Sequence, residues 1–184
     1  WALRHLLCVN LRFIARSDTT GLARVFVVFD KAERPGAEGV IEAARREFPG
    51  LPLEFCFYPR RAGKLVERID VSTFFNSMNN VTALGRCRTR WALLHDFDLY
   101  PLVPHYFSDV IAKMEREGLR FCGLELTRFD GLTDQDLILG TWCLGMDAQW
   151  LRNEHKPHEI FHRIGTVNGK RVNLDPYSWL QSRE

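Results

Sequence analysis

The sequence predicts a single domain of the α/β class, a sandwich in which helices cover a mostly parallel central sheet. The first observation is that short apolar runs alternate with stretches whose apolar residues recur at helical spacing. The second is that these runs are continuous rather than alternating, which is typical of parallel strands buried on both faces. The third is composition, because 184 residues with 46% hydrophobic and 26% charged side chains can enclose one sizeable core.

The first half of the chain shows this alternation most clearly. Apolar residues recur at helical spacing from Leu3 to Ile14, which predicts a helix over 3–15. The run RVFVVFD at 24–30 predicts a buried parallel strand. The elements expected next are a helix over 36–48, a strand over 53–58, a charged connection over 60–69 and a helix that starts at Ser72.

The second half continues the pattern as far as a C-terminal tail. A strand is expected in WALLHDFD at 91–98, and Asp147 is placed to cap a following helix. Little periodicity follows Lys156, so no regular element is expected in the tail. The remaining expected elements are a helix over 104–116, a strand over 119–126, a Gly/Asp-rich loop over 130–140 and a strand over 141–146.

Charge and cysteine content argue against several classes of protein. The formal net charge of +2 is too small to predict a nucleic-acid partner. No apolar stretch reaches the roughly 18–20 residues of a membrane-spanning helix. Five cysteines, an odd number without a C-x-x-C pair, favour a reducing compartment over a disulfide framework. We therefore expect a cytoplasmic location, with membrane association left to segments outside this sequence.

Two acids end the apolar run at 91–95. In an open α/β sheet, ligands bind beyond the carboxyl ends of the strands, and Asp30 ends an earlier run in the same way. Alternate residues of a strand share a face, so Asp96 and Asp98 are expected to converge. Converging carboxylates repel unless a cation intervenes, and Mg²⁺ or Mn²⁺ suits such oxygen ligands. The competing interpretation is that the acids only cap the next helix.

The stretch FFNSMNNVTALGRCRTRWALLHDFDLYP at 74–101 resembles the helix, strand and DxD motif of GT-A nucleotide-sugar glycosyltransferases. Its pattern is similar to family 2-like and LARGE-type glucuronyltransferase domains, in which a proline follows the acids. RVFVVFDKAERPG at 24–36 resembles the second strand of that family, whose terminal acid contacts the nucleoside. The resemblance implies one GT-A α/β/α sandwich over 1–184, with the first nucleotide-binding strand lacking or outside the sequence.

The resemblance also implies a metal-dependent enzyme that moves a sugar from a nucleotide-diphosphate donor, expected to be a UDP-sugar, to a carbohydrate or other hydroxyl acceptor. Asp96 and Asp98 would bind Mn²⁺ or Mg²⁺, and His162 would complete the metal shell. Asp175, in the stretch NLDPYSWLQ, is the candidate general base, with Asp147 as the alternative. The residues expected to contact the nucleotide are Asp30, Asn79, Asn80 and Asp96.

Three other functions compete with this one. A nucleotidyltransferase also uses strand-end acids with Mg²⁺, although it would need a Gly-rich basic loop early in the chain. A catalytically degenerate GT-A domain would bind sugar or protein without turnover. A phosphatase of the doubly wound type would place its Asp-x-Asp on the first strand with Gly and Thr behind it, whereas Leu99, Tyr100 and Pro101 follow the acids here.

Overall fold

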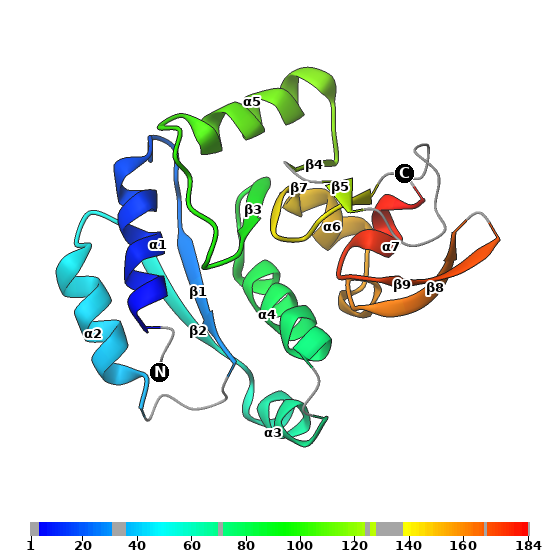
Figure 1. Ribbon diagram of the computed structural model, residues 1–184, viewed down its shortest axis with the longest axis horizontal. Helices are drawn as coiled ribbons and strands as arrows, with labels where there is room; N and C mark the ends of the chain where they lie inside the picture. The colour runs from blue at the N-terminus through cyan, green and yellow to red at the C-terminus, as the bar shows by residue number, and fades with distance from the viewer. Residues whose placement is uncertain are drawn as a thin grey trace.

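The computed structural model describes residues 4–30, 36–69, 72–123, 126–127, 138–167 and 169–183, which form a mixed α/β fold (Figure 1). Among these residues, no helix has the length and apolarity to cross a membrane. In chain order the elements are α1 (Arg4–Arg16), β1 (Val25–Phe29), α2 (Glu38–Glu47), β2 (Leu53–Phe57), α3 (Arg60–Ile69), α4 (Ser72–Arg86), β3 (Trp91–His95), α5 (Tyr106–Glu117), β4 (Phe121–Gly123), β5 (Leu126–Thr127), β6 (Ile138–Leu139), β7 (Cys143–Asp147), α6 (Ala148–Glu154), the 3₁₀ turn η1 (Pro157–Glu159), β8 (Arg163–Val167), β9 (Lys170–Leu174) and α7 (Ser178–Gln181).

The N-terminal part of the fold is built on the parallel pair β1 and β2, in which Val25 lies opposite Leu53. Apolar side chains of α1 and α2 pack against this pair and form one core cluster, with Leu11 fully buried within it. The helix predicted over 3–15 and the parallel strand predicted over 24–30 are both confirmed.

The second sheet has β7 at its centre, antiparallel to both β3 and β4. α5 covers one face so closely that a Cβ at Gly145 would lie 2.8 Å from Val110 Cγ1 and 2.9 Å from Met114 Sδ. On the other face, Leu144 belongs to a second core cluster with residues of α4 and α6. β7 is therefore enclosed on both sides.

The expectation of a mostly parallel sheet holds for β1 and β2 alone among the described strands. The other four pairings are antiparallel. A continuous apolar run indicates that a strand is buried on both faces. β7 is buried in this way although both of its neighbours are antiparallel to it. The direction of the strand therefore could not follow from its composition.

Segment 60–69, expected to be a charged connection, is the helix α3. Arg, Lys, Leu, Glu and Ala all have high helix propensity, and one glycine costs only about 1 kcal/mol against alanine. The prediction was wrong because it treated long charged side chains as a loop signal.

The tail after Lys156, where no regular element was expected, contains the antiparallel hairpin of β8 and β9 and the short helix α7. Gly169 lies in the hairpin turn with φ +78°, a conformation that glycine adopts without steric cost. Val172 and Leu174 are buried against Ile138, and Trp179 packs on the same cluster. This small third core explains why the segment is ordered.

Candidate functional site

The acid pair lies in a turn and not on the strand. β3 ends at His95, and the backbone N–H of Leu99 donates to the carbonyl of Asp96 at 3.1 Å. The prediction that Asp96 and Asp98 share a face of an extended strand is therefore wrong. The turn itself keeps the two carboxylates close enough that the charge of Asp98 acts on Asp96.

The negative charge of the two carboxylates is not compensated by a nearby positive charge among the described residues. Burial, and next the charge of Asp98, raises the pKa of the Asp96 carboxyl to about 6. Asp98 is exposed to solvent. In the described part of the chain, neither carboxylate forms an ion pair with a basic side chain. The turn thus presents concentrated negative charge that no described side chain neutralises.

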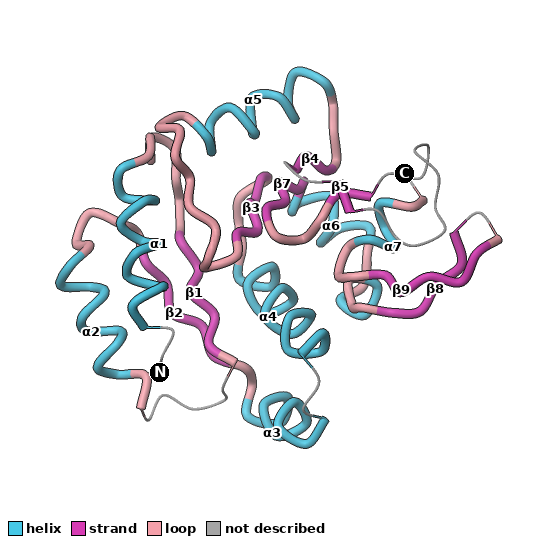
Figure 2. Tube along the Cα trace, in the orientation of Figure 1, coloured by secondary structure: helices cyan, strands magenta, loops and turns pink. Residues whose placement is uncertain are grey.

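The side chain of Asn10, in α1, forms hydrogen bonds with the backbone of this turn. Its side chain is buried, with 4% exposed, and Nδ2 donates to the carbonyl of Leu99 at 2.6 Å. The same nitrogen lies 3.3 Å from the carbonyl of Asp96 and 3.3 Å from Nδ1 of His95. Figure 2 shows the loop between β3 and α5 running beside α1, in agreement with these contacts. Asn10 was not predicted as a site residue, because its only signal in the sequence is a polar side chain on the apolar face of a helix.

A polar but uncharged layer lies beside the acids. Burial lowers the pKa of His95, although the charge of Asp98 opposes this effect. The imidazole ring of His95 lies edge-on to the ring of Phe107, with 6.1 Å between the two ring centroids. The hydroxyl of Tyr106 contacts the thiol of Cys143, and burial raises the pKa of both groups. His95, Tyr106 and Cys143 therefore supply no positive charge to the acid pair at neutral pH.

Asp30 and Asn79 belong to a separate group of polar side chains around Tyr58. Asp30 directly follows β1 and is exposed. Burial, and next the charge of Asp30, raises the pKa of Tyr58. The Tyr58 hydroxyl donates to Oδ1 of Asn79 at 2.6 Å. Asn80 instead is buried, and its Nδ2 donates to the carbonyl of Asn76 at 2.9 Å, so its amide is engaged within the protein.

The two remaining predicted residues lie in the C-terminal segment. The backbone N–H of His162 donates to Oγ of Ser77 at 3.1 Å, and its Nε2 is buried without a hydrogen-bond partner among the described residues. Asp175 is half-buried just before α7, where its carbonyl accepts from the N–H of Ser178 at 3.0 Å. Within the described ranges, no three His, Cys, Asp or Glu side chains form a group that could hold a metal ion. The described residues therefore do not group His162 with Asp96 and Asp98, and its role as a metal ligand stays a prediction.

Asp147, the alternative base, has a structural role. Its Oδ1 accepts from the backbone N–H of Trp150 at 2.9 Å, which confirms the predicted helix cap. Its Oδ2 accepts from Arg120 at 2.9 Å and from Arg90 at 3.5 Å. A side chain that is 2% exposed and bonded at both oxygens is not available to a substrate.

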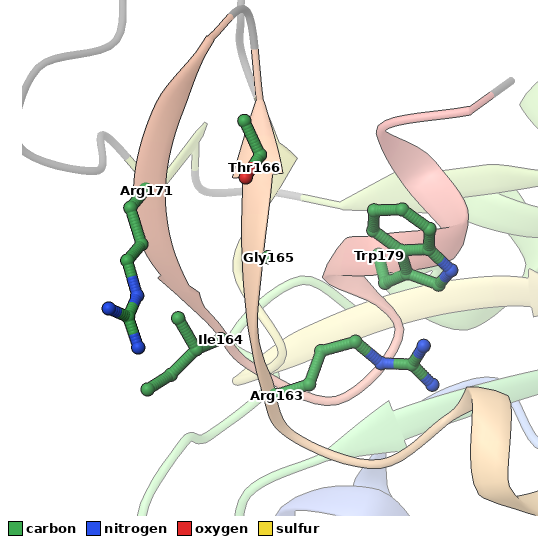
Figure 3. Close-up of a pocket in the computed structure, with 6 residues that line it drawn as sticks. All are labelled: Arg163, Ile164, Gly165, Thr166, Arg171 and Trp179. Atoms are coloured by element: carbon green, nitrogen blue, oxygen red, sulfur yellow. The ribbon is translucent and has the colours of Figure 1, made fainter.

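An open cavity of about 450 Å³ lies on the β8–β9 hairpin, and none of the predicted site residues lines it (Figure 3). The guanidinium groups of Arg163 and Arg183 each lie 5.5 Å from the ring centroid of Trp179. Figure 3 shows Arg163 and Arg171 leaving the hairpin in different directions, so they do not converge on one ligand position. The lining residues are Arg163, Ile164, Gly165, Thr166, Arg171 and Trp179.

Comparison of the chain with protein-family models, curated protein sequences and solved structures gave no match.

Proposed function

We propose that this protein is a metal-dependent glycosyltransferase that moves a sugar from a nucleotide-diphosphate donor, a UDP-sugar, to a hydroxyl acceptor. The main support is the acid turn after β3, where Asp96 and Asp98 lie close together without a described basic partner. The resemblance of 74–101 to the DxD region of GT-A glycosyltransferases gives the reaction class. The mixed α/β fold is compatible with a GT-A sandwich, which is part of the proposal.

The residues of the turn fit a divalent cation such as Mn²⁺ or Mg²⁺. The raised pKa of Asp96 means that its charged form lacks compensation, and a cation held between the two carboxylates would supply it. Both side chains offer the hard oxygen ligands that these ions prefer. Two protein ligands leave the other positions to water and phosphate oxygens, so the proposed site uses Asp96 and Asp98 without His162.

Each side chain of the proposed site then has a separate task. Asp98, the more exposed acid, binds the metal directly, and Asp96 contributes the second ligand and contacts the ribose. A bound ion would stabilise the negative charge that develops on the departing nucleoside diphosphate. Asp30 and Asn79, which flank Tyr58, contact the nucleoside. Asp175 takes the proton from the attacking hydroxyl of the acceptor.

Calorimetric titration of UDP in the presence and absence of Mn²⁺ tests this proposal. We expect wild-type protein to bind UDP only with the metal, and Asp98→Asn to weaken that binding by more than about 30-fold, since it removes a charged metal ligand. Asp109→Asn, which removes an exposed acid of α5, is the matched control and should bind as wild type does. Metal-dependent binding that survives in Asp98→Asn would contradict the assignment.

Turnover separates the two alternatives. A nucleotidyltransferase would release pyrophosphate from UTP in the presence of a sugar phosphate, and a degenerate domain would bind UDP and Mn²⁺ without hydrolysing or transferring any UDP-sugar. The glycosyltransferase proposal requires release of UDP from a UDP-sugar. No specific feature of the described residues favours either alternative over it.

A further inference from the structure

Exposed apolar side chains are concentrated in the loop that contains the acid turn and in the residue paired with Asp96. Six large apolar side chains are exposed among the described residues, and four of them belong to this region: Phe97, Leu102, Val103 and Trp142. Phe97 lies between the two acids, and Trp142 is adjacent across the sheet. Exposed apolar area beside a polar site is a common feature of ligand-binding surfaces.

Trp142 is placed next to Asp96 by the register of the sheet. The last residue pair of the β3–β7 ladder joins His95 to Cys143, and the N–H of Asp96 continues the ladder by donating to the carbonyl of Trp142 at 2.9 Å. This bond holds the backbone of Trp142 beside that of Asp96, at the start of the acid turn.

The exposure of Trp142 distinguishes it from the other tryptophans that the structure describes. Its side chain is 53% exposed, whereas Trp91, Trp150 and Trp179 are all partly buried. Each of those three packs against an arginine or another ring. In the described part of the chain, the indole of Trp142 has no hydrogen bond or ring contact. Its aromatic face is free for a ligand.

We infer that Trp142 is the platform against which a pyranose ring stacks at the acid turn, an inference that rests on the proposed glycosyltransferase function. A pyranose has an apolar C–H face that packs on an aromatic ring, and hydroxyl groups at its edge that donate hydrogen bonds to carboxylates. Trp142 and the neighbouring acids offer both partners within one surface. The ring is either the sugar of the donor or that of the acceptor, and the experiment separates these two sources.

The test compares wild-type protein with Trp142→Ala and Trp142→Phe. The affinities of UDP and UDP-glucose are measured by calorimetry with Mn²⁺, and saturation-transfer NMR follows the ring protons of methyl glucoside, methyl galactoside and methyl xyloside without nucleotide. Ile164→Ala is the control, because it removes an equally exposed apolar side chain on the distant hairpin. Since Trp142 is exposed, its replacement should leave the melting temperature nearly unchanged.

If the donor sugar stacks on Trp142, Trp142→Ala weakens UDP-glucose binding by about two- to tenfold and leaves UDP binding intact. Trp142→Phe then keeps most of the wild-type affinity for UDP-glucose. If the acceptor sugar stacks there, the methyl pyranosides lose their saturation transfer in Trp142→Ala and keep it in Trp142→Phe. Equal sugar binding in all variants overturns the inference. So does a change in oligomeric state of Trp142→Ala by light scattering, because the ring would then be covered by a second copy.

The same measurements separate the inference from the proposed function. Normal UDP and Mn²⁺ binding with no effect of Trp142→Ala on any sugar retains the transferase and rejects the platform. Pyranoside binding that depends on Trp142, in a protein that never binds UDP with Mn²⁺, retains the sugar platform and rejects the transferase. Absence of both kinds of binding rejects both.

Discussion

Replacement of Asn10 by leucine should release the acid turn from α1. The side chain of Asn10 is buried, and its amide nitrogen is the donor that reaches the carbonyl of Leu99 at 2.6 Å and that of Asp96 at 3.3 Å. Leucine has a similar volume but no donor. The substitution therefore removes the polar contacts of the turn while it keeps the packing between α1 and its neighbours.

The size of the effect follows from the groups that lose a partner. The Nδ2 group carries two hydrogens, so at most two of its three close acceptors are bonded at once. The short bond to Leu99 is fully lost, and a buried acceptor without a partner costs about 1–3 kcal/mol. The longer contact to Asp96 contributes less. We expect Asn10→Leu to lower the free energy of unfolding by about 2–3 kcal/mol.

Urea unfolding followed by circular dichroism measures this change, and Asn10→Asp provides an internal comparison. A charged carboxylate at position 10 cannot donate and is repelled by Asp96, whereas its protonated form can still donate one hydrogen bond. Asn10→Asp should therefore be less stable at pH 8 than at pH 5, relative to Asn10→Leu at the same pH values. A loss below about 0.5 kcal/mol in Asn10→Leu would show that the amide does not hold the turn.

Three further predictions test other parts of the structure. The raised pKa of Asp96 means that its ionisation opposes folding, a penalty that is complete above about pH 6 and absent below about pH 4. In urea unfolding, Asp96→Asn should therefore be more stable than wild type by roughly 1–3 kcal/mol at pH 8 and equal to it at pH 4. A stability advantage of Asp96→Asn that persists at pH 4 would refute the electrostatic cause. If Asp175 is the base, Asp175→Asn should reduce transfer at least about a hundredfold without changing UDP and Mn²⁺ affinity, and full activity would reject the role. Gly145→Ala should lower stability by about 1–3 kcal/mol in thermal unfolding, since its methyl group would press on Val110 and Met114, and an unchanged melting temperature would show that α5 can move away.

The parts of the fold that sequence predicted were those in which one periodicity dominates. α1 has apolar residues at helical spacing, and β1 is an uninterrupted apolar run, so each pattern admits one interpretation. The β8–β9 hairpin was missed although Asn168-Gly169 is a strong hairpin signal, because the flanking segments RIGTV and KRVNL are short and contain few apolar residues. Its order comes from contacts with Ile138, which lies far away in the sequence.

The candidate site was predicted only as far as local sequence reaches. Asp96 and Asp98 were identified from a short local motif, in which the two acids are one residue apart. Their geometry, however, depends on a turn that is bonded to Asn10, 86 residues before Asp96 in the sequence. The neighbours that decide the pKa of Asp96 likewise come from tertiary packing. The exposure of Trp142 could not be predicted either, because tryptophan in an apolar run is usually core.

The division of the interior into separate clusters has a consequence for the order of folding. One cluster is formed almost entirely by residues 7–57, and another by residues of α4, β3, β7 and the segments after them. Contacts between residues close in sequence form sooner than distant ones, so the N-terminal α/β unit can be built while the rest of the chain is still mobile. The bond between Asn10 and the carbonyl of Leu99 joins the two regions and can close only after both exist. The acid turn would then be among the last parts to reach its final position, and slow docking of the halves would appear as late recovery of ligand binding after secondary structure has returned.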